Sequence, residues 1–142
     1  LYLMDYRQMD AKALTRLLYK ESGLLGVSGI SQDMRVLLDS PAPEAREAVD
    51  LFCYRIVREI GSLAAALGGL DALVFTGGIG EHGAPVRQQV CAELGWLGLR
   101  LDAVANAANA SKISTSDSRI EVCVIPTNEE WIIARHVAEL TA

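Results

Sequence analysis

Features that mark several classes of protein are missing from this sequence. No apolar stretch reaches the ~20 residues needed to cross a bilayer, and no signal peptide is visible. The 18 aspartates and glutamates outnumber the 13 lysines and arginines, and no basic run offsets the net charge of -5. The sequence therefore predicts neither a membrane protein nor a nucleic-acid-binding protein. Small anionic ligands stay compatible with it, since they need only a local positive potential.

Two sequence patterns of catalysis are also missing. The pattern G-x-x-x-x-G-K-S/T does not occur, which excludes a P-loop NTPase. Only two histidines are present, His82 and His136, and neither has an identifiable nucleophile as a partner. No Ser/His/Asp or Cys/His set is therefore predicted.

Cysteine is scarce as well. Cys53, Cys91 and Cys123 are far apart, odd in number and embedded in apolar segments. They match no metal-ligand spacing and no disulfide framework. We predict reduced, buried thiols in a cytoplasmic protein.

The residues that are present are those of a globular domain. Of the 142 residues, 51% are hydrophobic and 22% are charged, which is typical of a soluble protein large enough to form one domain with its own core. The chain begins with Leu1 instead of Met, which predicts that a larger protein extends upstream.

One stretch, residues 71–83, organises the rest of the chain. The apolar run from Ala72 to Phe75 predicts a buried strand of a parallel sheet, and four glycines follow within seven residues. Beyond them, apolar residues recur at helical spacing, so we predict a strand, a tight glycine turn and a helix. Such a turn is often only a connection, but the N–H groups at the start of the helix also suit an anion such as phosphate.

Two sharper interpretations of the glycine turn compete. Gly78-x-Gly80-x-x-Gly83 fits a dinucleotide-binding fingerprint, with Asp102 about 20 residues further on as a ribose-binding carboxylate. The alternative is a nucleotide-phosphate loop of a kinase. Local spacing does not choose between them.

The first half of the chain is predicted to be helical. We expect an amphipathic helix from Met9 to Tyr19, a short helix capped by Ser31, and a long core helix from about Glu44 to Leu67 that Gly68-Gly69 ends.

The second half is predicted to hold a further strand and a final helix. Residues 99–102 suggest a short strand, and residues 103–118 read as a surface connection. Glu121 to Ile125 predicts a second apolar strand, after which Thr127 or Asn128 caps a final helix. In an α/β sheet, this second exit and the glycine turn open at the same carboxyl edge, where ligands bind.

Four of these segments, in this order and spanning almost the whole chain, resemble one family, the acetate kinases, within the sugar-kinase, heat-shock and actin-like ATPase superfamily. They are Lys20-Glu-Ser-Gly-Leu-Leu-Gly-Val-Ser-Gly29, Asp33-Met-Arg35, Val74-Phe-Thr-Gly-Gly-Ile-Gly-Glu81 and Val124-Ile-Pro-Thr-Asn-Glu-Glu130. Four ordered blocks are more specific than a glycine triplet, so they favour the kinase over the dinucleotide-binding protein. The resemblance implies a ribonuclease H-like, actin-like α/β fold. It also implies that residues 1–142 form a single nucleotide-binding domain, the carboxyl-terminal part of a longer two-domain kinase.

The resemblance also implies the site residues. Asp33, Met34 and Arg35 would line the adenosine side of an ATP site, and Glu129 would be associated with Mg²⁺, with Glu130 secondary. The second nucleotide loop would consist of Gly78, Ile79, Gly80, Glu81 and His82. The family usually has asparagine where His82 stands, so the side-chain contact at that position is open.

The implied reaction is the reversible transfer of the γ-phosphoryl group of ATP to acetate, giving ADP and acetyl phosphate. The catalytic arginines, histidine and aspartate of the family belong to blocks that this chain lacks, so no catalytic residue is assigned here and the chain alone is expected to be inactive. The family is typically dimeric and cytoplasmic. A propionate or butyrate kinase, or a non-catalytic nucleotide-binding module, is the alternative.

Overall fold

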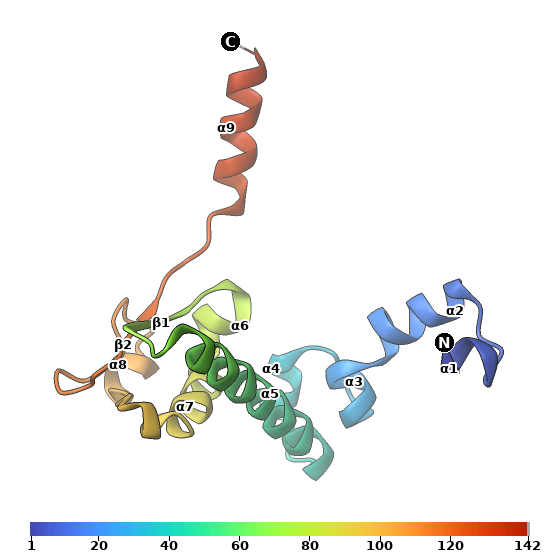
Figure 1. Cartoon of the computed structure of the whole chain (residues 1–142), viewed down its shortest axis with the longest axis horizontal. Coiled ribbons are helices and arrows are strands. Elements are labelled where there is room, and N and C mark those ends of the chain that lie inside the picture. Colours follow the sequence, from blue (N-terminus) through green and yellow to red (C-terminus); the bar gives the residue numbers. More distant parts are fainter. Residues whose placement is uncertain (142) are drawn as a thin grey trace. The chain divides into compact units, whose positions relative to one another are not determined.

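The computed structural model describes residues 1–141, except for the side chain of Glu129, and divides into two compact units, Leu1–Arg58 and Glu59–Ala142. Figure 1 labels the helices and strands. The elements are α1 (Tyr2–Asp5), α2 (Ala11–Arg16), a π-helical turn (Leu17–Glu21), α3 (Gly23–Ser28), α4 (Met34–Asp39), α5 (Pro43–Leu67), β1 (Ala72–Phe75), α6 (Gly77–His82), α7 (Ala84–Ala92), a 3₁₀ turn (Gly95–Leu97), α8 (Ala103–Ala107), β2 (Glu121–Val124) and α9 (Glu129–Thr141). That the whole chain forms one domain stays a prediction.

The first predicted helix forms with a change of pitch. Asp10 caps α2, since its carboxylate accepts a hydrogen bond of 2.7 Å from the N–H of Ala13. The helix then widens into the π-helical turn, and the hydroxyl of Ser22 donates to the carbonyl oxygen of Leu17 at 2.6 Å, five residues earlier. The chain therefore stays helical past Tyr19, where the sequence pattern ended.

The capping residue of α4 differs from the prediction. Asp33, and not Ser31, is the N-cap, because its carboxylate accepts a hydrogen bond of 2.9 Å from the N–H of Arg35. The hydroxyl of Ser31 instead accepts a hydrogen bond of 3.0 Å from the N–H of Asp33, in the segment that directly precedes α4.

The long helix α5 confirms the prediction to within one residue at its start. Its buried stripe contains Ala45, Val49 and Cys53, whereas Leu67, expected on the same face, is 73% exposed. Two glycines with positive φ, Gly68 and Gly69, end the helix, and the N–H of Gly69 bonds to the carbonyl oxygen of Ala64 at 2.9 Å.

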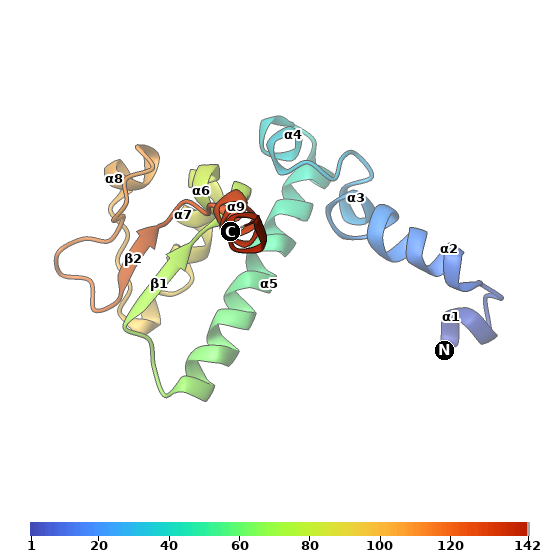
Figure 2. The same cartoon turned by 90° about the horizontal axis from the view of Figure 1, so that it is seen from above.

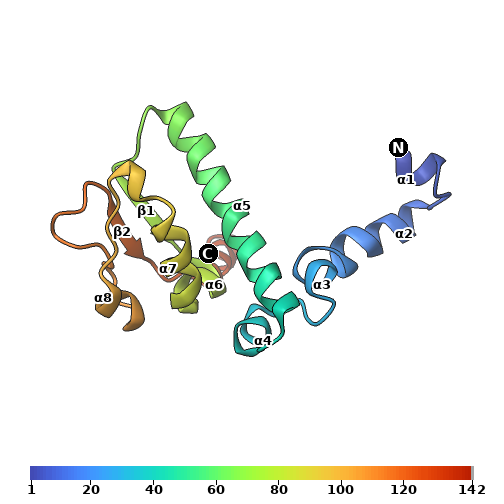
Figure 3. The same cartoon turned by 90° about the horizontal axis from the view of Figure 1, so that it is seen from below.

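The strands β1 and β2 pair in parallel, with Phe75 opposite Val124, which confirms the predicted parallel sheet (Figure 2). Alternate residues of β2, Val122 and Val124, are buried, and α7 lies over one face of the two strands (Figures 1 and 3). The prediction that β1 is buried on both faces is wrong for this chain, since Val74 is 47% exposed. An apolar run shows that a strand prefers burial but does not show how many of its faces are covered.

The segment 103–118 is not a low-information surface connection. It contains the short helix α8, which Asp102 caps through hydrogen bonds from the N–H groups of Val104 and Ala105. Asn106 and Ile113 are buried in the core of the second unit. The predicted strand at residues 99–102 is reduced to one bridge, between Leu101 and Ser114.

Candidate nucleotide site

The glycine segment after β1 is helical and not the open turn that its composition predicts. It forms α6, and only Gly77, the first residue of that helix, has a positive φ, of 72°. A helix needs no unusual dihedral angles inside it, so the glycines at 78 and 80 are not required by their backbone conformation.

The glycines of this segment meet different surroundings. A Cβ atom added at Gly77 or Gly78 would meet nothing within 4 Å. At Gly80 it would lie 3.3 Å from the backbone carbonyl carbon of Phe75, and at Gly83 it would lie 2.6 Å from the carbonyl oxygen of Ile79. Gly80 and Gly83 therefore allow close packing, whereas the backbone of Gly77 and Gly78 faces open space that another molecule can approach.

The side chain of Glu81 joins α6 to the segment that follows β2. One carboxylate oxygen, Oε1, accepts hydrogen bonds from the N–H of Gly77 at 2.9 Å, the N–H of Thr127 at 2.9 Å and the hydroxyl of Thr127 at 3.1 Å. The hydrogen bond from the backbone of Thr127 contributes most to lowering the pKa of Glu81. The carboxylate thus ties the two strand exits together.

The parallel pairing places both exits at one edge of the sheet, as the sequence predicts. The ladder continues one residue beyond β2, where the N–H of Ile125 bonds to the carbonyl oxygen of Phe75 at 2.9 Å. Asn128 is the N-cap of α9, accepting a hydrogen bond of 3.0 Å from the N–H of Trp131. Glu129, the residue predicted to be associated with Mg²⁺, is the first residue of α9, and its side chain lies outside the described residues.

Sequence reasoning missed the residue that holds the other end of α6. Arg87 on α7 is 0% exposed. Its Nη1 donates to the carbonyl oxygens of Gly80 at 2.8 Å and Glu81 at 2.9 Å. A signal was present in the sequence, because Arg87, Val90, Cys91 and Leu94 share one helical face and the last three are apolar. A cation on the apolar face of a helix marks a buried polar cluster.

The rest of the guanidinium contacts α8 and the residues after it. Nε donates to Oδ1 of Asn106 at 2.8 Å, and Nη2 donates to the carbonyl oxygen of Asn106 at 2.8 Å and to Oδ1 of Asn109 at 2.6 Å. Asn106 in turn donates to the carbonyl oxygen of Ala84 at 2.9 Å. Burial lowers the pKa of Arg87, but a guanidinium in a protein keeps its charge.

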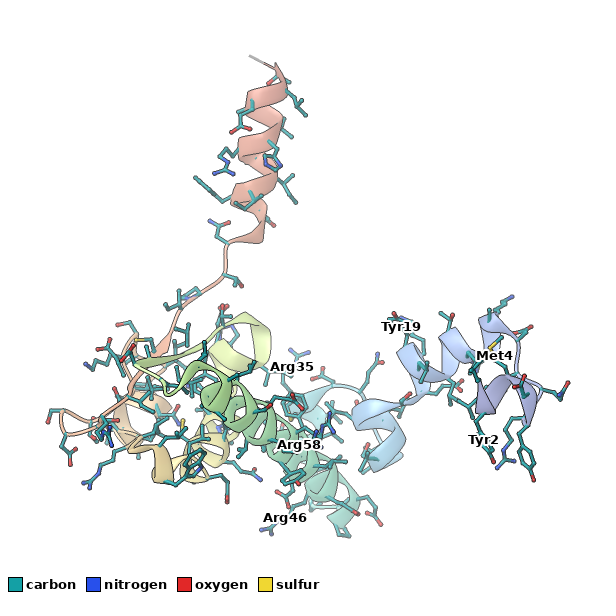
Figure 4. All side chains as sticks on the ribbon, in the orientation of Figure 1. Tyr2, Met4, Tyr19, Arg35, Arg46 and Arg58 are labelled. Atoms are coloured by element: carbon teal, nitrogen blue, oxygen red, sulfur yellow. The ribbon has the colours of Figure 1, made fainter. Side chains whose placement is uncertain are left out.

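The other predicted nucleotide residues lie in the first unit. Arg35 contacts Asp33 through Nε to Oδ1 at 3.1 Å and Nη2 to Oδ2 at 2.6 Å. The pKa of Asp33 is lowered by the hydrogen bonds from Arg35, and Asp33 raises the pKa of Arg35. The Arg35 side chain is 87% exposed, and Figure 4 labels it. Met34 is buried at 4% exposure, so its side chain belongs to the core of this unit.

The histidines and cysteines are the remaining reactive side chains. His82 and His136 are exposed. Cys53 and Cys91 are buried free thiols, as predicted, and burial raises the pKa of Cys53 to about 11 and that of Cys91 to about 12. Cys123, predicted to be buried, is only partly so. Among the described side chains, no three His, Cys, Asp or Glu residues are grouped to hold a metal ion.

The membrane prediction can be compared with the helices directly. None of the helices that the structure describes is both long enough and apolar enough to cross a membrane.

Comparisons with known proteins agree with one another. The model of the acetokinase family matches residues 1–135. The chain is 59% identical over 142 residues to the acetate kinase of Rhodopseudomonas palustris (strain TIE-1), covering 99% of this chain and 36% of that protein. It is 53% identical over 137 residues to the acetate kinase of Rickettsia akari (strain Hartford), covering 96% of this chain and 36% of that protein. The chain therefore spans about a third of the length of the curated relatives it matches.

Solved structures give the same fold. The crystal structure of Porphyromonas gingivalis acetate kinase matches with a TM-score of 0.87 and 36% identity, over 99% of this chain and 37% of that one. A propionate kinase from Francisella tularensis subsp. tularensis SCHU S4 matches with a TM-score of 0.84 and 35% identity, over 94% of this chain and 35% of that one. These matches confirm the predicted fold class, part of a ribonuclease H-like, actin-like ATPase domain. Since the family model matches residues 1–135 of the 142, the chain belongs to the acetokinase family.

Proposed function

We propose that the full-length protein containing this chain transfers the γ-phosphoryl group of ATP to acetate, reversibly. The observation that carries this proposal is the 59% identity, over 142 residues, to a protein named acetate kinase. In the reaction, a carboxylate oxygen of acetate forms a bond to the γ-phosphorus while the bond from that phosphorus to the bridging oxygen of ADP breaks. Positioning and charge stabilisation supply most of the catalysis in such transfers.

The contribution of this chain is to bind the nucleotide. We assign the adenosine side to Asp33, Met34 and Arg35, and the phosphate side to the segment from Gly78 to His82. The open space beside Gly77 and Gly78 supports the second assignment, because a bound group can reach their backbone there. Family membership supports both.

Glu81 is the residue of the α6 segment whose role we revise. Its Oε1 already accepts three hydrogen bonds, from Gly77 and Thr127. We propose that it fixes the two strand exits relative to each other instead of contacting the nucleotide directly through this oxygen.

The residues present fit a magnesium ion that is carried largely by the nucleotide. Mg²⁺ in kinases usually takes one or two carboxylates and completes its shell with phosphate oxygens and water, so a three-residue cluster is not required. We propose that Glu129 holds the ion, since it begins α9 directly after the Asn128 cap and Glu81 is occupied elsewhere. When bound, Mg²⁺ neutralises charge on the phosphate oxygens.

The proposed partners follow from this activity. They are ATP and ADP on one side and acetate and acetyl phosphate on the other, with no nucleic acid or membrane. We propose a cytoplasmic homodimer, as is typical of the family. The buried free thiols Cys53 and Cys91 agree with a reducing compartment.

The test is acetyl phosphate formation by the full-length gene product with ATP, Mg²⁺ and acetate, trapped as the hydroxamate. We expect turnover that depends on all three components and reverses with ADP and acetyl phosphate. The 142-residue chain alone is the matched control, and we expect it to be inactive because the acyl-binding blocks are missing from it. Absence of turnover by the full-length protein would reject the proposal.

A second substrate has specific support, since one solved structure of similar fold is named a propionate kinase. The same assay with propionate and butyrate decides between the two. We expect acetate to give the highest kcat/KM, because the relatives of 50% identity and more that are cited above are named acetate kinases. A preference for propionate would replace acetate in the proposal and leave the nucleotide site unchanged.

A further inference from the structure

The guanidinium of Arg87 is completely paired although it is completely buried. A guanidinium has five N–H donors in a fixed planar fork, and here each donor meets an oxygen, namely those of Gly80, Glu81, Asn109 and, twice, Asn106. Among the described residues, these acceptors are all carbonyl or amide oxygens, and none is a carboxylate. A buried cation without a counter-ion is costly and is tolerated only where its hydrogen bonds are complete.

Two of those acceptors belong to the segment that we assign to the nucleotide. The carbonyl oxygens of Gly80 and Glu81 are near the carboxyl end of α6, where a helix leaves carbonyl groups without partners of its own. Arg87 Nη1 satisfies both. Because α6 has only six residues, these two contacts anchor its carboxyl end to α7.

The amino end of α6 is connected to Arg87 indirectly, through Glu81. Glu81, whose backbone Arg87 fixes, reaches back with its side chain to the N–H of Gly77 and across to Thr127. A continuous series of hydrogen bonds therefore runs from Asn106 and Asn109 through Arg87 and α6 to Thr127, which lies two residues before Glu129. These hydrogen bonds link α6 to the segment at the start of α9.

We propose that Arg87 is a positioning residue for nucleotide binding, holding α6 and, through Glu81, the segment 127–129 in the geometry that accepts the phosphates. This inference rests on the proposed function and deepens it. Lysine cannot replace arginine here, because a single ammonium group has three donors around one nitrogen and cannot reach acceptors on both α6 and α8.

The test uses the full-length protein with Arg87→Lys and, as a milder change, Asn109→Gly. The glycine removes one acceptor of Nη2 and keeps the positive φ of 50° that residue 109 adopts. The control is Ile120→Ala, a core residue that directly precedes β2, at the edge of the sheet opposite α6. We expect it to lower the melting temperature by a comparable amount from a position outside α6.

We expect Arg87→Lys to raise the KM for ATP and the Kd for Mg-ADP, measured by calorimetry, roughly tenfold or more. The KM for acetate should change less than twofold. Asn109→Gly should raise the same two constants, the KM for ATP and the Kd for Mg-ADP, by a smaller factor. The Ile120 control should leave both unchanged. Amide hydrogen exchange should also quicken in residues 77–82 and at Thr127 in the Arg87 variant, and not in the control.

Two results would overturn the inference. One is an Arg87 variant whose nucleotide constants move no further than those of the control at equal loss of melting temperature. The other is unchanged amide protection of α6. If Arg87→Lys does not fold, Asn109→Gly decides by the same two criteria. If the unaltered protein binds Mg-ADP but does not phosphorylate acetate, the proposed function fails, and the Kd for Mg-ADP still decides the role of Arg87.

Discussion

The two parts of the proposed nucleotide site are held in opposite ways. Around α6, the contacts join residues far apart in the sequence, such as Arg87 with Asn106, 19 residues on, and Glu81 with Thr127, 46 residues on. Around Asp33, the contacts with Arg35 span only two residues and lie in solvent. The contacts around α6 form only when the unit Glu59–Ala142 is folded. The contacts around Asp33 need little more than the start of α4.

This difference predicts which substitutions matter. Long-range, buried hydrogen bonds leave unsatisfied groups in the core when one partner is removed, which is costly. Exposed local pairs can be replaced by water at small cost.

The largest effect is expected for Asn106→Ala. The substitution removes the acceptor of Arg87 Nε and the donor to the carbonyl oxygen of Ala84, both in the core. We expect the free energy of unfolding to fall by about 3 kcal/mol or more, measured by guanidinium chloride denaturation. The exposed Gln88→Ala on α7 is the control and should change stability by less than about 0.5 kcal/mol. A loss below about 1 kcal/mol for Asn106→Ala would show that water replaces its side chain.

The glycines of α6 offer a matched pair. At Gly80 the new methyl group lies 3.3 Å from the backbone of Phe75, so Gly80→Ala should destabilise by about 1–2 kcal/mol after the gain in helix propensity is subtracted. At Gly78 the space is open and φ is not positive, so Gly78→Ala should stabilise by up to about 1 kcal/mol.

For Gly78→Ala, the effect on nucleotide binding should be opposite to the effect on stability. Gly78→Ala places a methyl group where we propose the nucleotide approaches, so the Kd for Mg-ADP should rise although the protein is more stable. A Gly78 variant that is stabilised and binds Mg-ADP normally would contradict the assignment of this glycine to the site.

The exposed part of the site should respond more weakly. Asp33→Ala removes the N-cap of α4, and we expect a fall in melting temperature of about 3–5 °C. Ser31→Ala, the residue that the sequence pattern favoured as the cap, should cost less, because it removes only the hydrogen bond to the N–H of Asp33. The reverse order in a thermal scan would restore Ser31 as the main cap.

The smallest effect is a dependence on pH at Glu81. Its folded pKa is lowered, so the charged form contributes stability above the unfolded value of about 4.3. That contribution is lost as the pH falls through the folded pKa. Glu81→Gln should therefore melt below the unaltered protein at pH 7, and the difference should shrink as the pH approaches 3. A difference that is constant with pH would show that the charge of Glu81 is unimportant.

Local sequence signals predicted some elements of this molecule and missed others. The proline start and double-glycine end of α5, the two strands and their parallel pairing, and the four blocks of the acetokinase family are all readable from neighbouring residues. The role of residues 103–118 is not, because alanine, asparagine and serine give no apolar period, and their burial depends on a guanidinium 19 residues away. The helical form of Gly77–His82 was hidden for a similar reason, since glycine disfavours helix locally and tertiary contacts of Arg87 and Glu81 outweigh that preference.

The two attachments of α6 respond differently to acid. Arg87 is bonded to peptide and amide oxygens that do not titrate, whereas Glu81 holds Thr127 through a carboxylate that does. Acidification to below the ordinary range of a carboxyl pKa therefore weakens the link to the start of α9, whereas the hydrogen bonds that anchor the short helix to α8 keep their charge state. Of the two attachments of α6, the one through Glu81 is therefore the one that depends on pH.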